Sequence, residues 1–229
     1  MTARRPAARR GALAAPSRLA VLVPVLLAAA SLVPGCGRTV DGVPTAAAPS
    51  DRPTTAAELQ QLLVAAVPSG LPRLPDDEVE PPAGAKRLED VAGYAPDPAR
   101  ERAVLASYGY RFGWERFWGR ESGPMTGLFV DQFEQRSGAR AYAEDLARND
   151  AELYGGTLSE DPPELPGNCR LLTVDAPVPH AGLTGPAAFA WCWHGVFSVS
   201  VTAVAETADD AVREVGAVLD AQLALLPPA

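Results

Sequence analysis

The chain has 229 residues, and its 20 basic residues against 28 acidic residues give a formal charge of −8. This length allows one ordinary domain with additional segments, or two small domains. The first 35 residues hold five arginines and no acid, so a chain without them would have 15 basic and 28 acidic residues and a charge of −13. Phosphate backbones and anionic headgroups repel so acidic a chain, which argues against nucleic-acid binding and against membrane attachment by charge.

Residues 1–35 have the pattern of an export signal peptide. An arginine-rich start precedes an apolar run over 19–33, which is short for a membrane-spanning helix of roughly 20 residues. The run ends in Val33-Pro34-Gly35-Cys36, which resembles the lipobox of bacterial lipoproteins. The resemblance implies cleavage before Cys36 and lipid on its sulfur and amine, which would hold the chain on the extracytoplasmic face of the cell membrane. The alternative is an ordinary secretory signal with a chance cysteine, and the sequence leaves Sec and twin-arginine export both open.

Two further cysteines, Cys169 and Cys192, remain once Cys36 is assigned to lipid. Exported proteins fold in an oxidising compartment, so we expect these two cysteines to form a disulfide. The chain-entropy model values a loop of this size at roughly 3.5 kcal/mol. A metal site is a weaker alternative, because His194 would bring the ligands to three at best and the paired Cys-x-x-Cys spacing is missing.

The next two segments are predicted to connect the lipid anchor to the folded domain. Residues 36–54 are rich in Ala, Pro, Gly and Thr, which predicts a disordered tether. Residues 55–84 are predicted to be a helix, begun by a capping box of Thr55 and Glu58, followed by a Pro-rich acidic linker. The acidic run 76–80 lacks the alternating ligands and the glycine of a calcium loop.

Residues 85–229 are predicted to form one α+β domain. Asp97 and Pro98 predict the start of a helix that runs to about Tyr108 and stops at Gly109. The periodicity then indicates strands at 110–118 and 127–133 followed by a helix at 137–154, and strands at 189–193 and 195–204 followed by a helix at 207–226 that Thr207 caps. The strand 195–204 alternates apolar residues with Ser198, Ser200 and Thr202. Two strand-strand-helix units predict an antiparallel sheet of about four strands with helices packed on one face.

The stretch from Phe129 to Phe133, followed by Gly138-Ala139-Arg140-Ala141-Tyr142-Ala143, resembles secreted and lipoprotein domains of actinobacteria. Some relatives in that group are similar to extracellular sensor domains of actinobacterial kinases. The resemblance covers about half of the chain and implies an extracytoplasmic α+β domain of a small lipoprotein. It brings no catalytic residue with it.

An aromatic stripe on the first strand is the candidate ligand site. Trp114, Arg116 and Trp118 share one face, where rings and a guanidinium group would suit an apolar partner bearing an anionic group. Such a stripe also fills a sheet-helix core, which is the alternative. The opposite face, with Arg111, Glu115 and Arg120, is typical of a solvated polar surface.

No catalytic motif is present: the sequence has no Gly-x-Ser-x-Gly, His-Glu-x-x-His or phosphate loop, and its one lysine, Lys86, falls in a predicted linker. A serine with His180 or His194, or the acids Asp131 and Glu134, would be the remaining routes to catalysis. We therefore predict a non-enzymatic binding module of the cell envelope, without metal or cofactor, that binds an envelope protein or a small hydrophobic ligand. The alternatives are a carrier of a hydrophobic ligand, which needs an apolar cavity, and a hydrolase with an unrecognised site.

Overall fold

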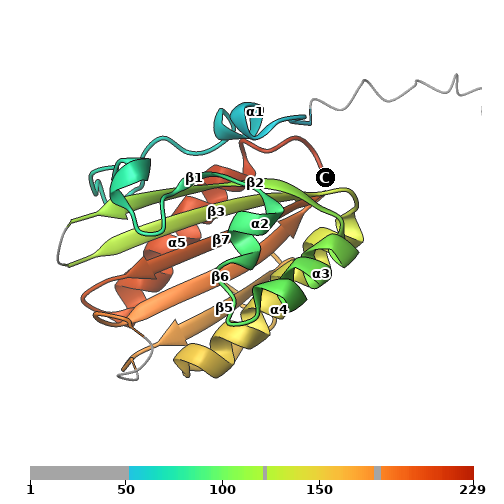
Figure 1. Cartoon of the computed structure of the whole chain (residues 1–229). Coiled ribbons are helices and arrows are strands. Elements are labelled where there is room, and N and C mark those ends of the chain that lie inside the picture. The colour runs from blue at the N-terminus through green and yellow to red at the C-terminus, as the bar shows by residue number, and fades with distance from the viewer. Residues whose placement is uncertain (1–51, 121–122, 178–181) are drawn as a thin grey trace, which may run out of the picture. The chain divides into compact units, whose positions relative to one another are not determined.

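The computed structural model describes residues 52–120, 123–177 and 182–229. Its seven strands form one antiparallel sheet in the order β1-β2-β3-β7-β6-β5-β4 (Figure 1). The strands are β1 (Gly84–Lys86), β2 (Tyr110–Gly119), β3 (Met125–Phe133), β4 (Thr157–Ser159), β5 (Cys169–Val174), β6 (Ala187–His194) and β7 (Phe197–Val204). The helices are α1 (Ala56–Gln60), α2 (Leu88–Ala92), α3 (Pro98–Tyr108), α4 (Arg136–Tyr154) and α5 (Ala208–Leu223), with a 3₁₀ turn at Asp76–Glu78.

The predicted sheet of about four strands is wrong, because the sheet has seven. The two predicted units are present as β2-β3-α4 and β6-β7-α5, and β3 pairs with β7 where the units meet. The prediction missed β1, β4 and β5, which lie at the two edges of the sheet. These strands are three to six residues long, too short to show a clear alternation of apolar and polar residues.

Helices cover both faces of the sheet, where the sequence predicted one. We call the face under α1 and α5 the back face, and the face under α2, α3 and α4 the front face (Figure 1). Because side chains alternate along a strand, β6 and β7 serve both faces and are buried along nearly their whole length. Among the described residues, no helix has both the length and the apolar character needed to span a membrane.

The capping residues predicted from the sequence lie at the ends of the helices. The hydroxyl of Thr207 accepts a hydrogen bond from the backbone of Asp210 and begins α5. Asp97 does the same for α3 through the backbone of Arg100, and Gly109 ends that helix in a left-handed conformation with φ of 74°. These caps fix where the chain enters and leaves each strand.

The segment before β1 packs on the back face and belongs to the same compact unit as the rest of the described chain. Buried polar side chains of β2 and α5 bind its backbone. Arg116 donates to the carbonyls of Leu63 and Val64 at 3.0 and 2.7 Å, and Gln222 donates to Leu62 at 2.8 Å and accepts from Val64 at 3.0 Å. The predicted helix and linker therefore have a fixed place against the sheet. Residues 36–51, which include Cys36 and most of the predicted tether, lie outside the described residues.

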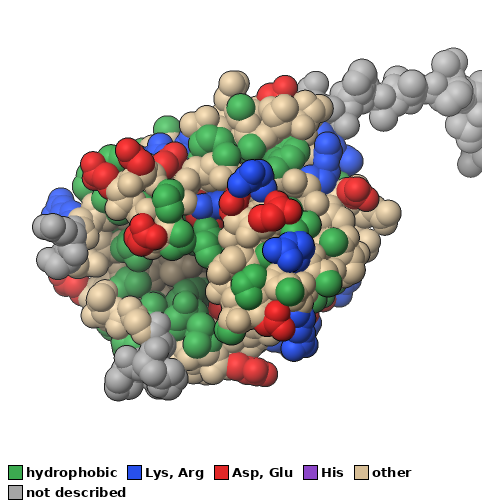
Figure 2. Space-filling view, in the orientation of Figure 1, with side chains coloured by type: hydrophobic (Ala, Val, Ile, Leu, Met, Phe, Trp, Pro, Cys, Tyr) green, Lys and Arg blue, Asp and Glu red, His purple; other side chains and the backbone are tan. Residues whose placement is uncertain are grey.

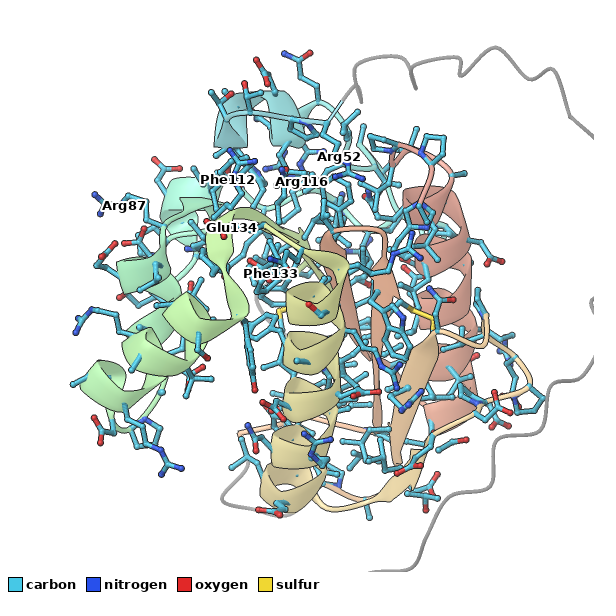
Figure 3. The ribbon with its side chains drawn as sticks, turned by 90° about the vertical axis from the view of Figure 1, so that its right-hand side faces the viewer. Arg52, Arg87, Phe112, Arg116, Phe133 and Glu134 are labelled. Carbon is cyan, nitrogen blue, oxygen red and sulfur yellow. A yellow bond between two sulfur atoms is a disulfide. The ribbon has the colours of Figure 1, made fainter. Side chains whose placement is uncertain are left out.

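The predicted disulfide is confirmed. Cys169 of β5 lies directly opposite Cys192 of β6 in the strand register, and the two sulfurs are bonded (Figure 3). Both side chains are fully buried in the back-face core. The bond therefore fixes β5 to the sheet at the end of a loop that spans 23 positions.

Candidate functional site

The three residues of the predicted aromatic site lie on the back face, inside the fold. Trp118 is 1% exposed and Arg116 is 7% exposed, and Trp114 packs against the same core cluster. Figure 3 shows Arg116 close to the α1 segment, whose carbonyls accept its hydrogen bonds. This burial favours the core alternative for the stripe, and ligand binding by these residues stays an untested prediction.

The front face has a hollow because small side chains lie in its central strand. Ser200 and Thr202 of β7 point to this face. The strand register places Phe129 of β3 and Trp191 of β6 on either side of Ser200, and Phe189 of β6 beside Thr202. Large rings on the outer strands and small polar groups between them leave space above β7.

The helices turn this hollow into a cleft. α2 and α4 form its walls, and the cavity has a volume of about 270 Å³. Figure 2 shows the hollow on this face with hydrophobic side chains around it. The lining side chains are aromatic, aliphatic, acidic or hydroxylated: Val91, Tyr94, Glu115, Phe129, Asp131, Tyr142, Leu146, Asp150, Tyr154, Phe189, Trp191, Ser200 and Thr202. None of them is basic.

Stacked rings form one wall of the cleft. The rings of Tyr154 and Phe189 stack with centroids 4.6 Å apart, and Phe189 lies nearly parallel to Trp191 at 5.9 Å. On the other side, the ring of Phe129 meets Phe117 edge to face at 5.4 Å. Because neighbouring rings restrict each other's rotamers, this wall is preformed.

Asp131 places a buried carboxyl group at the cleft. Its side chain is 7% exposed, and the hydroxyl of Tyr110 donates a hydrogen bond of 3.0 Å to Oδ1. Burial raises the pKa of Asp131 to about 7, although this hydrogen bond acts in the opposite direction. Gly113 lies opposite on β2, and a Cβ there would overlap Oδ1 of Asp131. The absence of a side chain at Gly113 therefore makes room for the carboxyl group.

Glu115 is a second buried acid, and it has a cation as its partner. Lys86 of β1 lies 3.0 Å from one carboxylate oxygen, and the hydroxyl of Tyr94 donates to both oxygens at 3.0 and 3.1 Å. Burial nevertheless raises the pKa of Glu115 above its ordinary value. The expectation of a solvated surface at Glu115 and of a linker at Lys86 is thus wrong, because β1 adds a strand beside β2 and α2 covers both residues.

Two further polar groups of the cleft lack partners. Asp150 of α4 makes no hydrogen bond or ion pair within the described part of the chain, and burial raises its pKa to about 6. The hydroxyl of Ser200, a residue that is 6% exposed, is buried without a hydrogen-bond partner. Buried polar groups are normally paired, so Ser200 marks a position where a ligand or water would bind. Asp150 is half-buried and faces the same cavity.

The catalytic routes left open by the sequence do not come together in the cleft. The ring of His194 lies 2.9 Å from the carbonyl of Pro227, away from the cleft lining, and His180 lies outside the described residues. Glu134 lies beside Gly109 in a separate depression, whereas Asp131 faces the cleft. Within the described ranges, no group of three His, Cys, Asp or Glu side chains is arranged to hold a metal ion.

The sequence did not indicate Glu115, Asp150 or Ser200 as site residues, and Asp131 was named only as a possible catalytic acid together with Glu134. The alternation of Ser198, Ser200 and Thr202 was visible, but nothing in the sequence showed that helices cover that face. The signal that could have indicated the cleft was a strand with small polar residues on one face, flanked by two strands with aromatic residues. A solvent-exposed face does not need such rings.

Comparisons with known proteins give a weak structural match and no family. No protein-family model matches the sequence, and a search of curated proteins finds no match. A solved structure that matches is the extracellular domain of PknH from Mycobacterium tuberculosis, with a TM-score of 0.39 and 14% identity over 75% of this chain and 98% of that chain. A match at this TM-score carries no argument about function.

Proposed function

We propose that this protein is a non-catalytic extracytoplasmic module that binds a small ligand in the front-face cleft. The observation that carries the proposal is the cleft itself, which joins a preformed aromatic wall to buried polar groups without partners. Small-molecule sites are typically concave and largely apolar, with a few convergent polar groups that orient the ligand. The cleft has these properties before any ligand is present.

The extracytoplasmic location rests on two features of the chain. The disulfide between Cys169 and Cys192 fits an oxidising compartment. The signal pattern that ends at Cys36 supports export and lipid attachment, as in small bacterial lipoproteins. Together these features support a tethered domain on the extracytoplasmic side of the membrane.

The anchor is tested by Cys36→Ala in the full chain. We expect the variant to appear in the medium, or to remain as an uncut precursor, because the lipid-accepting sulfur is gone. Cell fractionation shows where the variant is found, and the intact mass of the exported protein shows whether it is cut and lipidated. A variant that is cut and retained in the membrane fraction like the natural chain would remove lipid attachment at Cys36.

Binding is tested by blocking the cleft floor. Ser200→Phe places a ring between Phe129 and Trp191 and should abolish binding of small molecules, measured by ligand-observed NMR on the fragment from Ala47, which forms one compact unit. Thr157→Phe adds the same ring on the exposed edge strand β4 and should leave binding intact. If a fragment library gives no hit that Ser200→Phe removes, the cleft is not a ligand site.

An envelope hydrolase is the second candidate, favoured by one observation. Asp131 and Asp150 lie in one cleft and have pKa values raised to about 7 and about 6, as is common for catalytic acids. If the protein turns over a glycoside, ester or peptide substrate and Asp131→Asn abolishes that turnover, the protein is an enzyme and not a binding module. Retained binding without turnover supports the module.

A further inference from the structure

We infer that the ligand of the front-face cleft is a small organic cation, an amine or ammonium group on an apolar body. The inference rests on the proposed function and specifies the ligand class of that site. It follows from the juxtaposition of buried carboxyl groups, stacked rings and an unpartnered hydroxyl in one cavity.

The charges of the cleft are unbalanced. Glu115, Asp131 and Asp150 line it, and no lysine or arginine does. Within the described ranges, Lys86 is the one cation in contact with these acids, and it pairs with Glu115 at 3.0 Å. Asp131 has only the neutral hydroxyl of Tyr110 as a partner, and Asp150 has none within the described residues. A cation in the cavity would supply the missing counter-charge.

The rings of the cleft suit the same ligand. Tyr154, Phe189 and Trp191 form a continuous stacked wall, and aromatic faces attract a cation that lies within about 6 Å of a ring centroid. The wall also offers apolar surface to the body of the ligand. A carboxylate opposite stacked rings is therefore a complementary site for an ammonium group attached to carbon.

The unpartnered hydroxyl of Ser200 is an independent indication of a polar ligand group. This side chain lies on the cavity floor between the rings of Phe129 and Trp191. Its oxygen is buried and makes no hydrogen bond, although a hydroxyl can accept a bond from an ammonium N–H. The acids, the rings and this hydroxyl thus point to one occupant.

Other ligand classes fit less well. An anion would meet three carboxyl groups without a basic side chain to receive it. A bare metal ion needs several oxygens converging on one point, and the described residues contain no such group of acids. A neutral molecule would leave the buried carboxyl groups without a counter-charge.

The test compares three probes that share one aromatic body and differ in charge: 2-phenylethylamine, 2-phenylethanol and phenylacetate. Their affinities are measured by calorimetry at pH 8 on the fragment from Ala47. We expect the amine to bind about tenfold tighter than the alcohol, and phenylacetate to be the weakest. Asp131→Asn and Asp150→Asn should each reduce the preference for the amine and leave the affinity for the alcohol within about twofold.

A control variant and three possible outcomes distinguish failure of the cation inference from failure of the proposed binding function. Asp77→Asn changes an exposed acid outside the cleft and should leave all three affinities unchanged. Equal binding of amine and alcohol, removed by Ser200→Phe, would overturn the cation inference while the binding function stands. Failure of all three probes, together with a fragment library that gives no cleft hit, would overturn both. An amine preference that survives both acid-to-amide variants would also overturn the inference.

Discussion

The two faces of the sheet are built from the same strands but differ in their chemistry. The back face is a continuous apolar core under α1 and α5, where Leu128, Val199 and Val201 are completely buried. The front face places acids, hydroxyls and rings under α2 and α4, and it leaves a cavity of about 270 Å³. Apolar packing provides most of the stability of a fold, so the back face can hold the sheet together while the front face keeps a cavity.

β7 shows the division within one strand. Val199 and Val201 pack on α5, whereas Ser198, Ser200 and Thr202 point to the front face. The hydroxyls of both Ser198 and Ser200 are buried without hydrogen-bond partners. Unpaired buried hydroxyls lower stability, but the back face also holds buried atoms without a partner, at Trp114, Arg116 and Trp118. The feature that sets the front face apart is therefore the cavity beside Ser200.

The largest expected effect separates two neighbours on β3. Leu128 points to the back face and is 0% exposed, whereas Phe129 lines the cleft and is partly exposed. Leu128→Ala should lower the free energy of unfolding by about 3 kcal/mol, because it leaves a cavity in a closed core. Phe129→Ala should cost about half as much, although it removes a larger side chain, because water already reaches the cleft.

Urea unfolding of both variants measures this difference, with ligand binding as a second readout. Phe129→Ala should weaken binding of the phenyl probes, and Leu128→Ala should not. A stability loss for Phe129→Ala as large as that for Leu128→Ala would mean that the front face is as tightly packed as the back face.

The next largest effect tests the space that Gly113 provides. A Cβ at Gly113 would overlap Oδ1 of Asp131 and would lie 2.8 Å from the hydroxyl of Tyr110. Gly113→Ala should therefore lower the free energy of unfolding by about 2 kcal/mol, within the usual range for overpacking a core.

A double-mutant cycle identifies the cause of that loss. In an Asp131→Ala background the carboxyl group is gone, so Gly113→Ala should cost about 1 kcal/mol less. Equal costs in the two backgrounds would show that the position is limited by the hydroxyl of Tyr110 or the carbonyl of Val130, and not by the carboxyl group. Circular dichroism should confirm that each variant remains folded.

The central part of the fold followed from local patterns. The strands β2, β3 and β7, the caps at Asp97 and Thr207 and the disulfide all came from signals within a few residues or from cysteine chemistry. The edge strands did not, because β1 and β4 have three residues each and exist only through pairing with a neighbour. Sheet size is therefore set by long-range pairing, which a single sequence does not display.

The burial of the predicted site could not be seen in the sequence for a related reason. Trp114, Arg116 and Trp118 were correctly assigned to one face of a strand, but the sequence could not show that α1 covers that face. Glu115 was assigned to the other face, and the sequence could not show that Lys86 and Tyr94 bury it. The alternation of side chains along a strand shows which face of the sheet a residue is on. Whether another segment covers that face depends on contacts between residues far apart in the sequence.

The smallest expected effect is a gain in stability at the front face. The pKa of Asp131 is raised from 3.8 to about 7 by burial, so the folded chain keeps this proton over a range where the unfolded chain has lost it. The folded state then binds more protons between about pH 4 and pH 7, and stability falls as pH rises through this window. Above about pH 7 the full penalty of a buried, ionised Asp131 is present.

Asp131→Asn removes this titration, and its amide oxygen can still accept the hydrogen bond from Tyr110. The variant should match the natural chain near pH 4 and exceed it by about 1 kcal/mol at pH 8, measured by urea unfolding across that range. Asp77→Asn, at an exposed acid, should show no such gain. Loss of stability in Asp131→Asn at pH 8 would mean that the carboxylate already has a stabilising partner within the protein. The expected result is a gain in stability together with loss of the preference for an amine ligand. That combination would mean that the natural chain keeps a destabilising charge at the position where the ligand's charge binds.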